Sequence, residues 1–531
     1  MNDLLIENAR IIDGSGAPWF RGAVVVDGGE IKTVYRDSSP DTNTSTIIDA
    51  DDSIVCPGFI DTHSHSDMKL FDDPMLSPKI RQGITTEVLG QDGFSMAPMY
   101  RDGGAEEWSK QLSALAGQVD MEWTWGSVGE YLDAVEENGI GPNIGLLVGH
   151  GTVRFNVLGM SDSAPSESEL TEMADLVTEG LEDGALGFST GLIYTPCTYA
   201  DTHEVRELAS KLGPYGRPFI AHIRSEGRWI WDALDEFVDI GDEEKIPLHL
   251  SHFKLAGQMQ QGKVDLATTF IEIARERGVD LTAEQYPYTA GSTMLSAVLP
   301  PWVHADGPDR MLEYLQDEDT RERIVRDVEE WRIEGWENIG SLAGWKNVVI
   351  TNVESETNKH CEGMSVREIA TERDVEPVKA ICDLLVEEKL SVSISLHMMS
   401  EDDVQDILSY EHVCVGTDGL FGGKPHPRVY GSYPRILGHY VREENLLSIE
   451  EAVRKMTSLP ARAMGLDRKG VLRTGMDADL VIFDPATVNT QATFENPRRY
   501  PKGIEHVIVN GEFAVRDSEI TERLPGQAVR K

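Results

Sequence analysis

The alternation of short apolar strands with amphipathic helices predicts an α/β protein built on a (β/α)8 TIM-like barrel. Eight candidate strands in the middle of the chain support this fold class. Both ends of the chain carry strand-and-turn signals of a different texture, such as "GAVVVDGGEIKTV" and "HVIVNGEFAV". We therefore expect a small β-sandwich domain, formed by both chain termini, beside the barrel.

The eight candidate strands of the barrel each end at a polar or glycine-containing segment. They are residues 58–63, 84–90, 143–149, 184–190, 218–224, 247–253, 279–286 and 411–418. One connecting helix is especially clear, because Ser166 and Glu169 form a capping box and apolar residues then recur at helical spacing up to Gly184. Eight such units predict a closed barrel.

The last two candidate strands are separated by residues 287–410, which is too long for a structureless loop. We expect an inserted subdomain at about 293–405, with helix over 306–338. The predicted domains are therefore a β-sandwich of residues 1–56 and 466–531 and a barrel of residues 57–465.

The net charge of the chain argues against two classes of partner. The chain of 531 residues has 48 basic and 91 acidic residues, a formal net charge of −43. Such a surface repels nucleic acid and anionic membranes, so we expect neither as a partner. We expect a small-molecule substrate instead, and the protein could also form a homo-oligomer. The acids are spread through the chain, which favours the hypothesis of a halophilic protein whose self-repulsion is screened by salt.

Cysteine usage and hydropathy indicate the cellular compartment in which the protein works. The five cysteines are scattered and form no CxxC motif, which argues against a disulfide framework and a zinc finger. The N-terminal residues lack the apolar core of a secretory signal, and no apolar run is long enough to span a membrane. We expect a cytoplasmic protein.

Histidine and aspartate side chains stand at five of the predicted strand ends. His63 and His65 lie two residues apart after the first strand, where both rings can face one ion. The other four are Asp92, His222, His252 and Asp418. Each alone fits an ordinary hydrogen-bonded residue. Together they predict a metal site, because buried ionisable groups are costly unless they are paired or bound to metal.

These residues lie in motifs that resemble the amidohydrolase superfamily: "PGFIDTHSH", "HIRSEG", "LSHFK", "GTDG" and "HPR". The segments "GHGTVR", "GALGFSTGLIYTP", "YPYTAGST" and "YGSYPRILGHYVRE" are similar, more narrowly, to the D-aminoacylase group, the N-acyl-D-amino-acid deacylases. The likeness extends over nearly the whole chain. The fold of that family is a barrel beside a small β-sandwich, in agreement with the expectation above.

The resemblance implies a metal-dependent hydrolase of N-acyl-D-amino acids that uses Zn²⁺. It implies a tight metal on Asp92, His222 and His252, and a weaker one on His63 and His65 with Asp92 bridging. Asp418 would then accept a proton from water and deliver it to the leaving amine. The candidates for binding the substrate carboxylate are Lys254, Tyr286, Ser292 and Arg428.

The sequence departs from that family at the metal site. Asp92 in "QDGFS" stands where the group typically has the cysteine of "NCGFS", so the identity of the metal is less certain than the site. The fourth strand, "GALGFSTGLIY", has no lysine to bridge two ions. Two alternatives stay open: a cyclic amidase of the hydantoinase or dihydroorotase kind, and a catalytically silent binding protein.

Overall fold

The computed structural model describes residues 2–38, 40, 43–116, 121–331 and 333–531. Its centre is an eight-stranded parallel sheet in the order β16-β12-β11-β10-β9-β8-β7-β6. The strands are β6 (Phe59–Asp61), β7 (Ile84–Leu89), β8 (Asn143–Gly149), β9 (Gly187–Gly191), β10 (Phe219–His222), β11 (Leu248–Leu250), β12 (Leu281–Gln285) and β16 (Val413–Val415). All eight predicted strands are confirmed.

The two outer strands of this sheet meet at their carboxyl ends. Ser64 forms a parallel bridge with Gly419, and the backbone N–H of Asp418 donates to the His63 carbonyl at 2.8 Å. These contacts nearly close the sheet into a barrel, which confirms the predicted fold class. Because every strand of a parallel barrel ends on the same side, the polar residues that follow the strands converge there.

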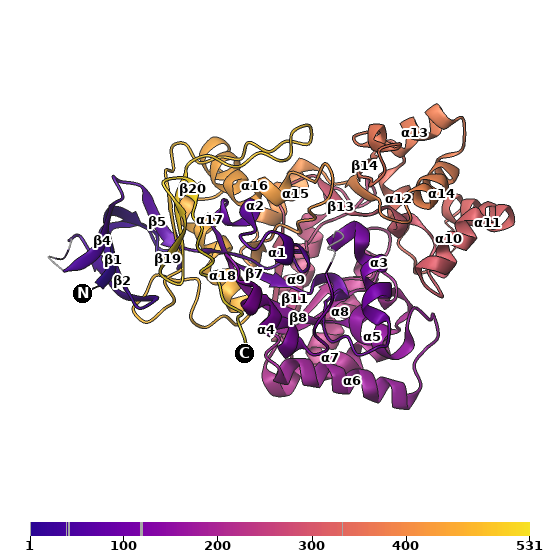
Figure 1. Cartoon of the computed structure of the whole chain (residues 1–531), viewed down its shortest axis with the longest axis horizontal. Helices are drawn as coiled ribbons and strands as arrows, with labels where there is room; N and C mark the ends of the chain where they lie inside the picture. Colours follow the sequence, from indigo (N-terminus) through magenta and orange to yellow (C-terminus); the bar gives the residue numbers. More distant parts are fainter. Residues whose placement is uncertain (1, 39, 41–42, 117–120, 332) are drawn as a thin grey trace.

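Helices surround the barrel (Figure 1). They include α4 (Val128–Asn138), α5 (His150–Leu158), α6 (Glu167–Glu182), α7 (Thr202–Ala209), α8 (Ile230–Glu244), α9 (Val264–Glu276), α15 (Glu401–Ser409) and α17 (Ile449–Met456). Shorter or flanking helices are α1 (Lys69–Asp72), α2 (Ser77–Ile80), α3 (Gly104–Ala116), α16 (Arg428–Arg435) and α18 (Ser458–Ala463). The predicted capping box of α6 is present, since Ser166 accepts from the Glu169 N–H and Glu169 accepts from the Ser166 N–H.

Strands from both chain ends pair in one nine-stranded mixed sheet. It contains β1 (Asn2–Ile11), β2 (Phe20–Asp27), β3 (Glu30–Arg36), β4 (Thr44–Asp49), β5 (Ile54–Pro57), β17 (Leu480–Phe483), β18 (Ile504–Val509), β19 (Glu512–Arg516) and β20 (Glu519–Ile520). Strand β5 joins the two halves, because it pairs parallel to β1 and antiparallel to β17. Leu4 and Val24 pack in one apolar core with Leu480 and Ile508. The predicted β domain of both termini is thus confirmed.

The segment between β12 and β16 forms a unit with its own apolar core, at the end of the molecule away from the terminal sheet (Figure 1). It holds α10 (Pro308–Gln316), α11 (Glu318–Glu329), α12 (Ile339–Ala343), α13 (Val366–Arg373) and α14 (Pro377–Glu387). The helix expected over 306–338 is divided at Asp317, whose side chain accepts from the Thr320 N–H at 2.9 Å and caps α11. Residue 332 of that range lies outside the described residues.

The sequence predicted only helix within the insertion, and this part of the prediction is incomplete. The insertion also contains an antiparallel sheet in the order β13-β15-β14, formed by β13 (Ala290–Met294), β14 (Val348–Asn352) and β15 (Ser393–His397). Strand β13 pairs with β15 across about a hundred residues of sequence, from Ala290 with His397 to Met294 with Ser393. This pairing matters for function, because β13 places Ser292 beside the barrel mouth. The domain limits given above stay a prediction.

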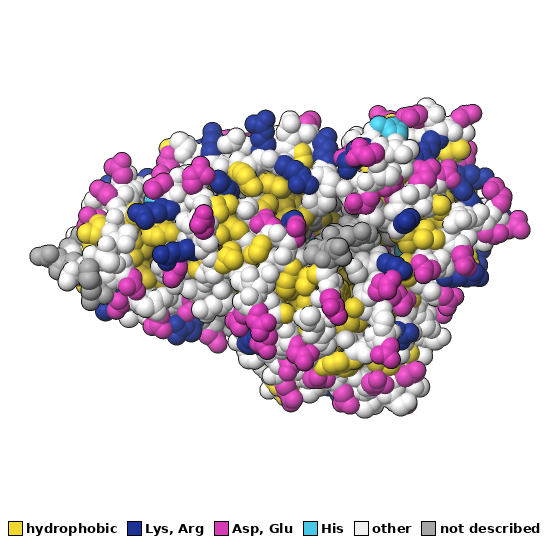
Figure 2. Space-filling view, viewed as in Figure 1, with side chains coloured by type: hydrophobic (Ala, Val, Ile, Leu, Met, Phe, Trp, Pro, Cys, Tyr) yellow, Lys and Arg dark blue, Asp and Glu magenta, His cyan; other side chains and the backbone are white. Residues whose placement is uncertain are grey.

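Acidic side chains are scattered over the visible face of the molecule (Figure 2), in keeping with the net charge of −43. None of the helices in the described part of the chain is long and apolar enough to cross a membrane.

Candidate metal centre

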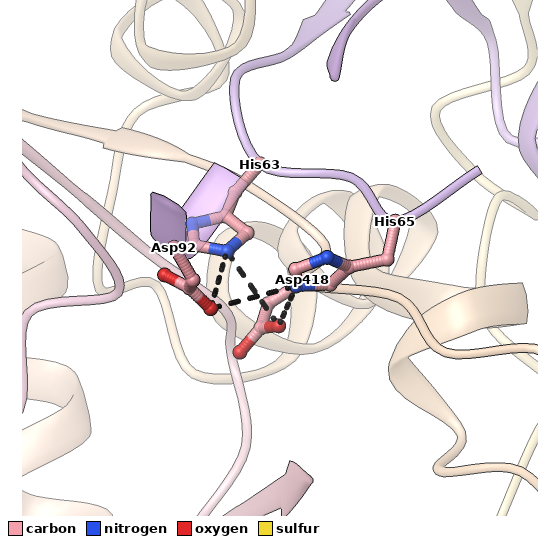
Figure 3. A group of neighbouring side chains, drawn as sticks. All are labelled: His63, His65, Asp92 and Asp418. Atoms are coloured by element: carbon pink, nitrogen blue, oxygen red, sulfur yellow. Dashed lines mark ion pairs between the residues drawn. The ribbon is translucent and has the colours of Figure 1, made fainter. Parts of the chain in front are cut away.

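The six strand-end residues predicted to hold a metal or move a proton converge at the barrel mouth. His63, His65, Asp92 and Asp418 form one group whose potential ligand atoms all lie within 4.8 Å of one another (Figure 3). Asp92, His222 and His252 form a second group by the same measure. Asp92 belongs to both groups, so the two are halves of one centre.

One oxygen of Asp92 faces the first histidine pair. The Nε2 atoms of His63 and His65 each lie 3.6 Å from Asp92 Oδ2. The same two nitrogens lie 3.7 and 3.3 Å from Asp418 Oδ1 (Figure 3). Two imidazoles and two carboxylates therefore point at one small volume, with spacings that an ion between them would bridge.

The other oxygen of Asp92 faces the second histidine pair. Asp92 Oδ1 lies 3.5 Å from His252 Nε2 and 3.8 Å from His222 Nδ1. The two rings are 4.3 Å apart between centroids and nearly perpendicular. A carboxylate with one oxygen toward each pair can bridge two ions.

The backbone at three of these positions is left-handed. The φ angles are 56° at Asp92, 49° at Asp418 and 33° at His252. Such conformations are unfavourable for residues other than glycine and collect at functional sites. The Asp92 loop is also packed tightly, because a Cβ on Gly191 would lie 2.4 Å from the Asp92 carbonyl oxygen. The fold thus holds the carboxylate in one place.

Several buried polar atoms of the centre have no hydrogen-bond partner among the described residues. They are His63 Nε2, Asp92 Oδ1 and both ring nitrogens of His222. Leaving a buried polar group unpaired costs about 1–3 kcal/mol. Divalent cations in the two halves would satisfy His63 Nε2, Asp92 Oδ1 and one ring nitrogen of His222, so the residues present fit a metal. Imidazole and carboxylate ligands suit Zn²⁺ and also Mn²⁺.

Burial and charge set the protonation of the centre. Burial disfavours the charged form of His63, but Asp92, Glu284 and Asp418 outweigh it and raise its pKa well above the ordinary value. Burial lowers the pKa of His222 to about 3, which keeps its ring neutral. Burial would raise the pKa of Asp92, but the histidines around it hold that pKa well below its usual range. The carboxylate is therefore ionised and available to a cation.

The four predicted carboxylate binders form one connected group around Tyr286 and Arg428. Arg428 Nη2 is 2.9 Å from Asp418 Oδ1. The ring of Tyr286 lies 4.5 Å from the Arg428 guanidinium carbon and 5.7 Å from Lys254 Nζ. The Ser292 carbonyl accepts from Arg428 Nη2 at 3.1 Å, while the Ser292 hydroxyl donates to the Ile394 carbonyl at 2.9 Å. Ser292 thus contacts Arg428 through its backbone.

Arg428 has the most donor capacity left. Its side chain is fully buried, and its Nε and Nη1 atoms have no hydrogen-bond partner in the structure. Burial would raise the pKa of Asp418, but Arg428 and the nearby histidines keep it low. Lys254, in contrast, donates to Glu226 and lies 2.7 Å from His252 Nδ1.

Three charged residues of the site were not found from the sequence: Lys79, Glu226 and Glu284. Lys79 is completely buried on α2, and its Nζ donates to Asp61 Oδ2 at 2.7 Å, Ser64 Oγ at 2.8 Å and Thr417 Oγ1 at 2.8 Å. Ser64 lies between the two histidines of the first pair, and Thr417 directly precedes Asp418. One ammonium group therefore ties together the two strand ends that close the barrel. The sequence gives no sign of this burial, because a lysine is almost never fully buried unless it is paired.

His150 and Cys197 belong to a buried network behind the Asp92 loop. His150 Nδ1 lies 2.8 Å from Thr190 Oγ1, and its Nε2 lies 2.9 Å from Glu204 Oε1. Burial opposes the charge on His150, but Cys197 and Glu204 raise its pKa to about 9. A Cβ on Gly93 would lie 2.8 Å from Cys197 Sγ, so the thiol packs directly against the loop. This network supports the loop from behind.

Comparison with known proteins agrees with this geometry. A D-aminoacylase of Alcaligenes xylosoxydans xylosoxydans is 34% identical over 530 residues, covering 100% of this chain and 98% of the relative. The structure also resembles that of N-acyl-D-glutamate deacylase from Bordetella bronchiseptica, with a TM-score of 0.85 and 31% identity over 100% of both chains. That neighbour was solved with zinc and a phosphonate mimic of the tetrahedral intermediate.

A structure of D-aminoacylase concerned with its binuclear metal center aligns with a TM-score of 0.84 and 32% identity, again over 100% of both chains. The model of the Amidohydrolase family matches residues 46–515. With full-length relatives and a family match over most of its length, this chain belongs to the amidohydrolase family.

Proposed function

We propose that this protein is a metal-dependent hydrolase of N-acyl-D-amino acids, which releases a carboxylate and a D-amino acid. The observation that carries the proposal is the position of Asp92 between two histidine pairs, with Asp418 and Arg428 beside them. Such a site combines a cation, a proton acceptor and a carboxylate receptor. The full-length relatives named above are deacylases of this class.

The ligands of the centre would be His63, His65, Asp92, His222 and His252, and zinc is the ion reported in a structural neighbour. When bound, a divalent cation polarises the amide carbonyl and lowers the pKa of a water molecule. The replacement of the expected cysteine by Asp92 gives an all-oxygen-and-nitrogen ligand set, which other divalent ions also accept.

Asp418 is the proposed general acid and base. In the hydrolysis, a water oxygen adds to the amide carbon, the C–N bond breaks, and one water proton ends on the amine nitrogen. Asp418 Oδ1 lies 3.3 Å from His65 Nε2, at the edge of the centre, where it can take that proton and pass it to the nitrogen. Because its carboxyl is ionised, it is ready to act as a base first.

Arg428 is the proposed receptor for the substrate carboxylate. Its Nε and Nη1 atoms, which have no hydrogen-bond partner among the described residues, could each donate a charge-assisted hydrogen bond to a carboxylate. Lys254 and Tyr286 lie on the same side and would complete a positive pocket, with Ser292 holding Arg428 in place. A local positive pocket is needed because the protein as a whole repels anions.

The test is a substrate panel on one metal-loaded preparation whose metal content is measured. We expect hydrolysis of N-acetyl-D-amino acids, little with the L forms, and none with hydantoins. Hydrolysis of hydantoins alone would favour the cyclic amidase. Against that alternative, β9 and its flanks carry no lysine that could bridge two ions. No hydrolysis of any member would favour the binding protein.

We also propose that the protein works in the cytoplasm and at high salt. The support is the net charge of −43 and five buried cysteines without a disulfide. A thermal unfolding series in KCl tests the salt hypothesis, because screening should raise the melting temperature; maximal stability in dilute buffer would end it. A homo-oligomer stays a prediction, which sedimentation analysis tests.

A further inference from the structure

Two buried carboxylates that belong to neither predicted ligand set lie directly behind the histidines. Glu284 is on β12 and is 1% exposed, and Glu226 follows β10 and is 8% exposed. Each one contacts the histidine rings of only one half of the centre. A carboxylate behind a metal-binding histidine fixes its ring orientation and the nitrogen that carries the proton.

Glu284 stands behind the first histidine pair. Its Oε1 lies 2.5 Å from His63 Nδ1, and its Oε2 lies 2.7 Å from His249 Nε2. Because an ionised carboxylate can only accept, the proton of His63 lies on Nδ1. A metal-binding histidine is neutral, so in that form of His63 the lone pair of Nε2 is turned toward Asp92 and Asp418, and this nitrogen has no hydrogen-bond partner among the described residues. His249 anchors the far oxygen of Glu284 in the barrel interior.

Glu226 stands behind the second pair. Its Oε1 lies 2.9 Å from His252 Nδ1, and its Oε2 lies 3.7 Å from His222 Nε2. Lys254 also pairs with Oε1 and balances the buried charge. For His252 Nε2 to face Asp92 with a free lone pair, its proton must lie on Nδ1 and point at Glu226. Lys254 Nζ also lies 2.7 Å from His252 Nδ1; since an ammonium group can only donate, it must direct its N–H groups to Glu226 when that nitrogen carries the proton.

We propose that Glu284 and Glu226 are positioning residues that act separately: Glu284 tunes cation binding at the His63–His65 half, and Glu226 tunes it at the His222–His252 half. This rests on the proposed metal centre and goes beyond it, because it assigns a distinct supporting carboxylate to each half. The geometry shows the separation, since Glu284 accepts from the His63 ring and Glu226 lies against the rings of His222 and His252. One backbone contact crosses over, from the His252 N–H to Glu284 Oε1 at 3.3 Å.

The experiment compares Glu284→Gln and Glu226→Gln in the full chain, with Glu388→Gln as the matched control. Glu388 is likewise a buried carboxylate, but it belongs to the insertion, where it accepts hydrogen bonds from the Ser355 N–H and from Asn358 Nδ2. Each metal-free variant is loaded with Zn²⁺ at a series of concentrations set by a competing chelator. Zinc-edge anomalous diffraction then reports the occupancy of each half separately, and this readout does not depend on activity.

We expect Glu284→Gln to weaken zinc binding about 10- to 100-fold at the His63–His65 half alone, and Glu226→Gln to do so at the His222–His252 half alone. Glu388→Gln should change zinc binding at neither half. Equal loss at both halves in either variant, or no loss in both, would overturn the proposal. If the wild-type protein holds a single zinc ion, only the Gln variant of the carboxylate behind the occupied half should weaken zinc binding. Weaker zinc binding in the other Gln variant would then overturn the proposal. A wild-type protein that binds no zinc would instead contradict the proposed function.

Should a Gln variant fail to fold, Glu284→Asp and Glu226→Asp keep the charge and shorten the reach. We expect the Asp variants to lose occupancy at the same half as the Gln variants, because position as well as charge is required. A melting temperature measured without metal separates loss of folding from loss of binding. An Asp variant that folds and binds zinc normally at its half would contradict the positioning role.

Discussion

The barrel mouth and the terminal sheet use buried residues in opposite ways. In the sheet, Ile6, Val24, Leu480 and Ile508 are completely buried in an apolar core. At the mouth, equally buried positions hold histidines and carboxylates, some with unpartnered atoms, and three of these residues have left-handed backbones. The sheet therefore contributes stability, while the mouth keeps polar atoms in place for a ligand at a cost in stability. Substitutions in the two regions should separate binding from folding.

The largest effect is expected at the residue shared by both halves of the centre. Asp92→Ala should remove most of the bound metal, with affinity lower by more than about 100-fold, the upper range seen for residues that merely support a ligand. Asp92→Cys supplies another ligand and should retain metal. Metal analysis after gel filtration measures both. Normal metal content in Asp92→Ala would mean that Asp92 only shapes its loop.

Lys79 tests whether the mouth also depends on paired charge for folding. Lys79→Met leaves Asp61 buried without its cation, so we expect the free energy of unfolding to fall by about 3–5 kcal/mol. The matched control is Lys69→Met, whose ion pair with Asp72 is partly exposed and should contribute at most about 1 kcal/mol. Denaturant unfolding of both variants gives the comparison. Equal effects would show that the buried network does not hold the barrel closed.

Leu480 tests the sheet side of the comparison. Leu480→Ala opens a cavity in a fully buried core and should cost about 2–5 kcal/mol of unfolding free energy. Metal content and turnover at a temperature where the variant is folded should match the wild type, since the core is remote from the mouth. A drop in metal affinity would show that the two regions are coupled.

The N-cap of α6 at Ser166 shows how much a single local hydrogen bond contributes to the free energy of unfolding. Ser166→Ala removes the cap of α6 and should cost about 0.5–2 kcal/mol, without any change in metal content. Ser166→Asp, which preserves an accepting oxygen at the cap, should recover most of that loss in a thermal unfolding measurement. If Ser166→Ala is as stable as the wild type, the cap is not a source of stability.

Most of the barrel was predictable because its signals are local. Each strand is a short apolar run, and five of the eight lead into a polar residue that faces the centre, as at His222 and Asp418. Once eight strands are placed, parallel geometry alone brings their ends together. The convergence of His63, His65, Asp92, His222, His252 and Asp418 followed from that rule and from the family resemblance.

What the sequence could not show depends on contacts between distant segments. The sheet of the insertion was missed because β13 and β15 are far apart in the chain, and neither segment alone shows that the two pair. Glu284 was missed because its partners His63 and His249 come from other strands. Glu226 had a weak signal, four residues after His222 in a quoted motif, but its link to His252 and Lys254 appears only in three dimensions.

The central claim is that Asp418 moves the proton in a reaction that depends on the metal centre. The most direct measurement compares wild type and Asp418→Asn on an N-acetyl-D-amino acid, with metal content determined on the same samples. We expect metal content close to wild type and kcat lower by about 100- to 10,000-fold, the range for loss of a general acid or base. Unchanged activity in a metal-loaded Asp418→Asn protein would contradict the mechanism.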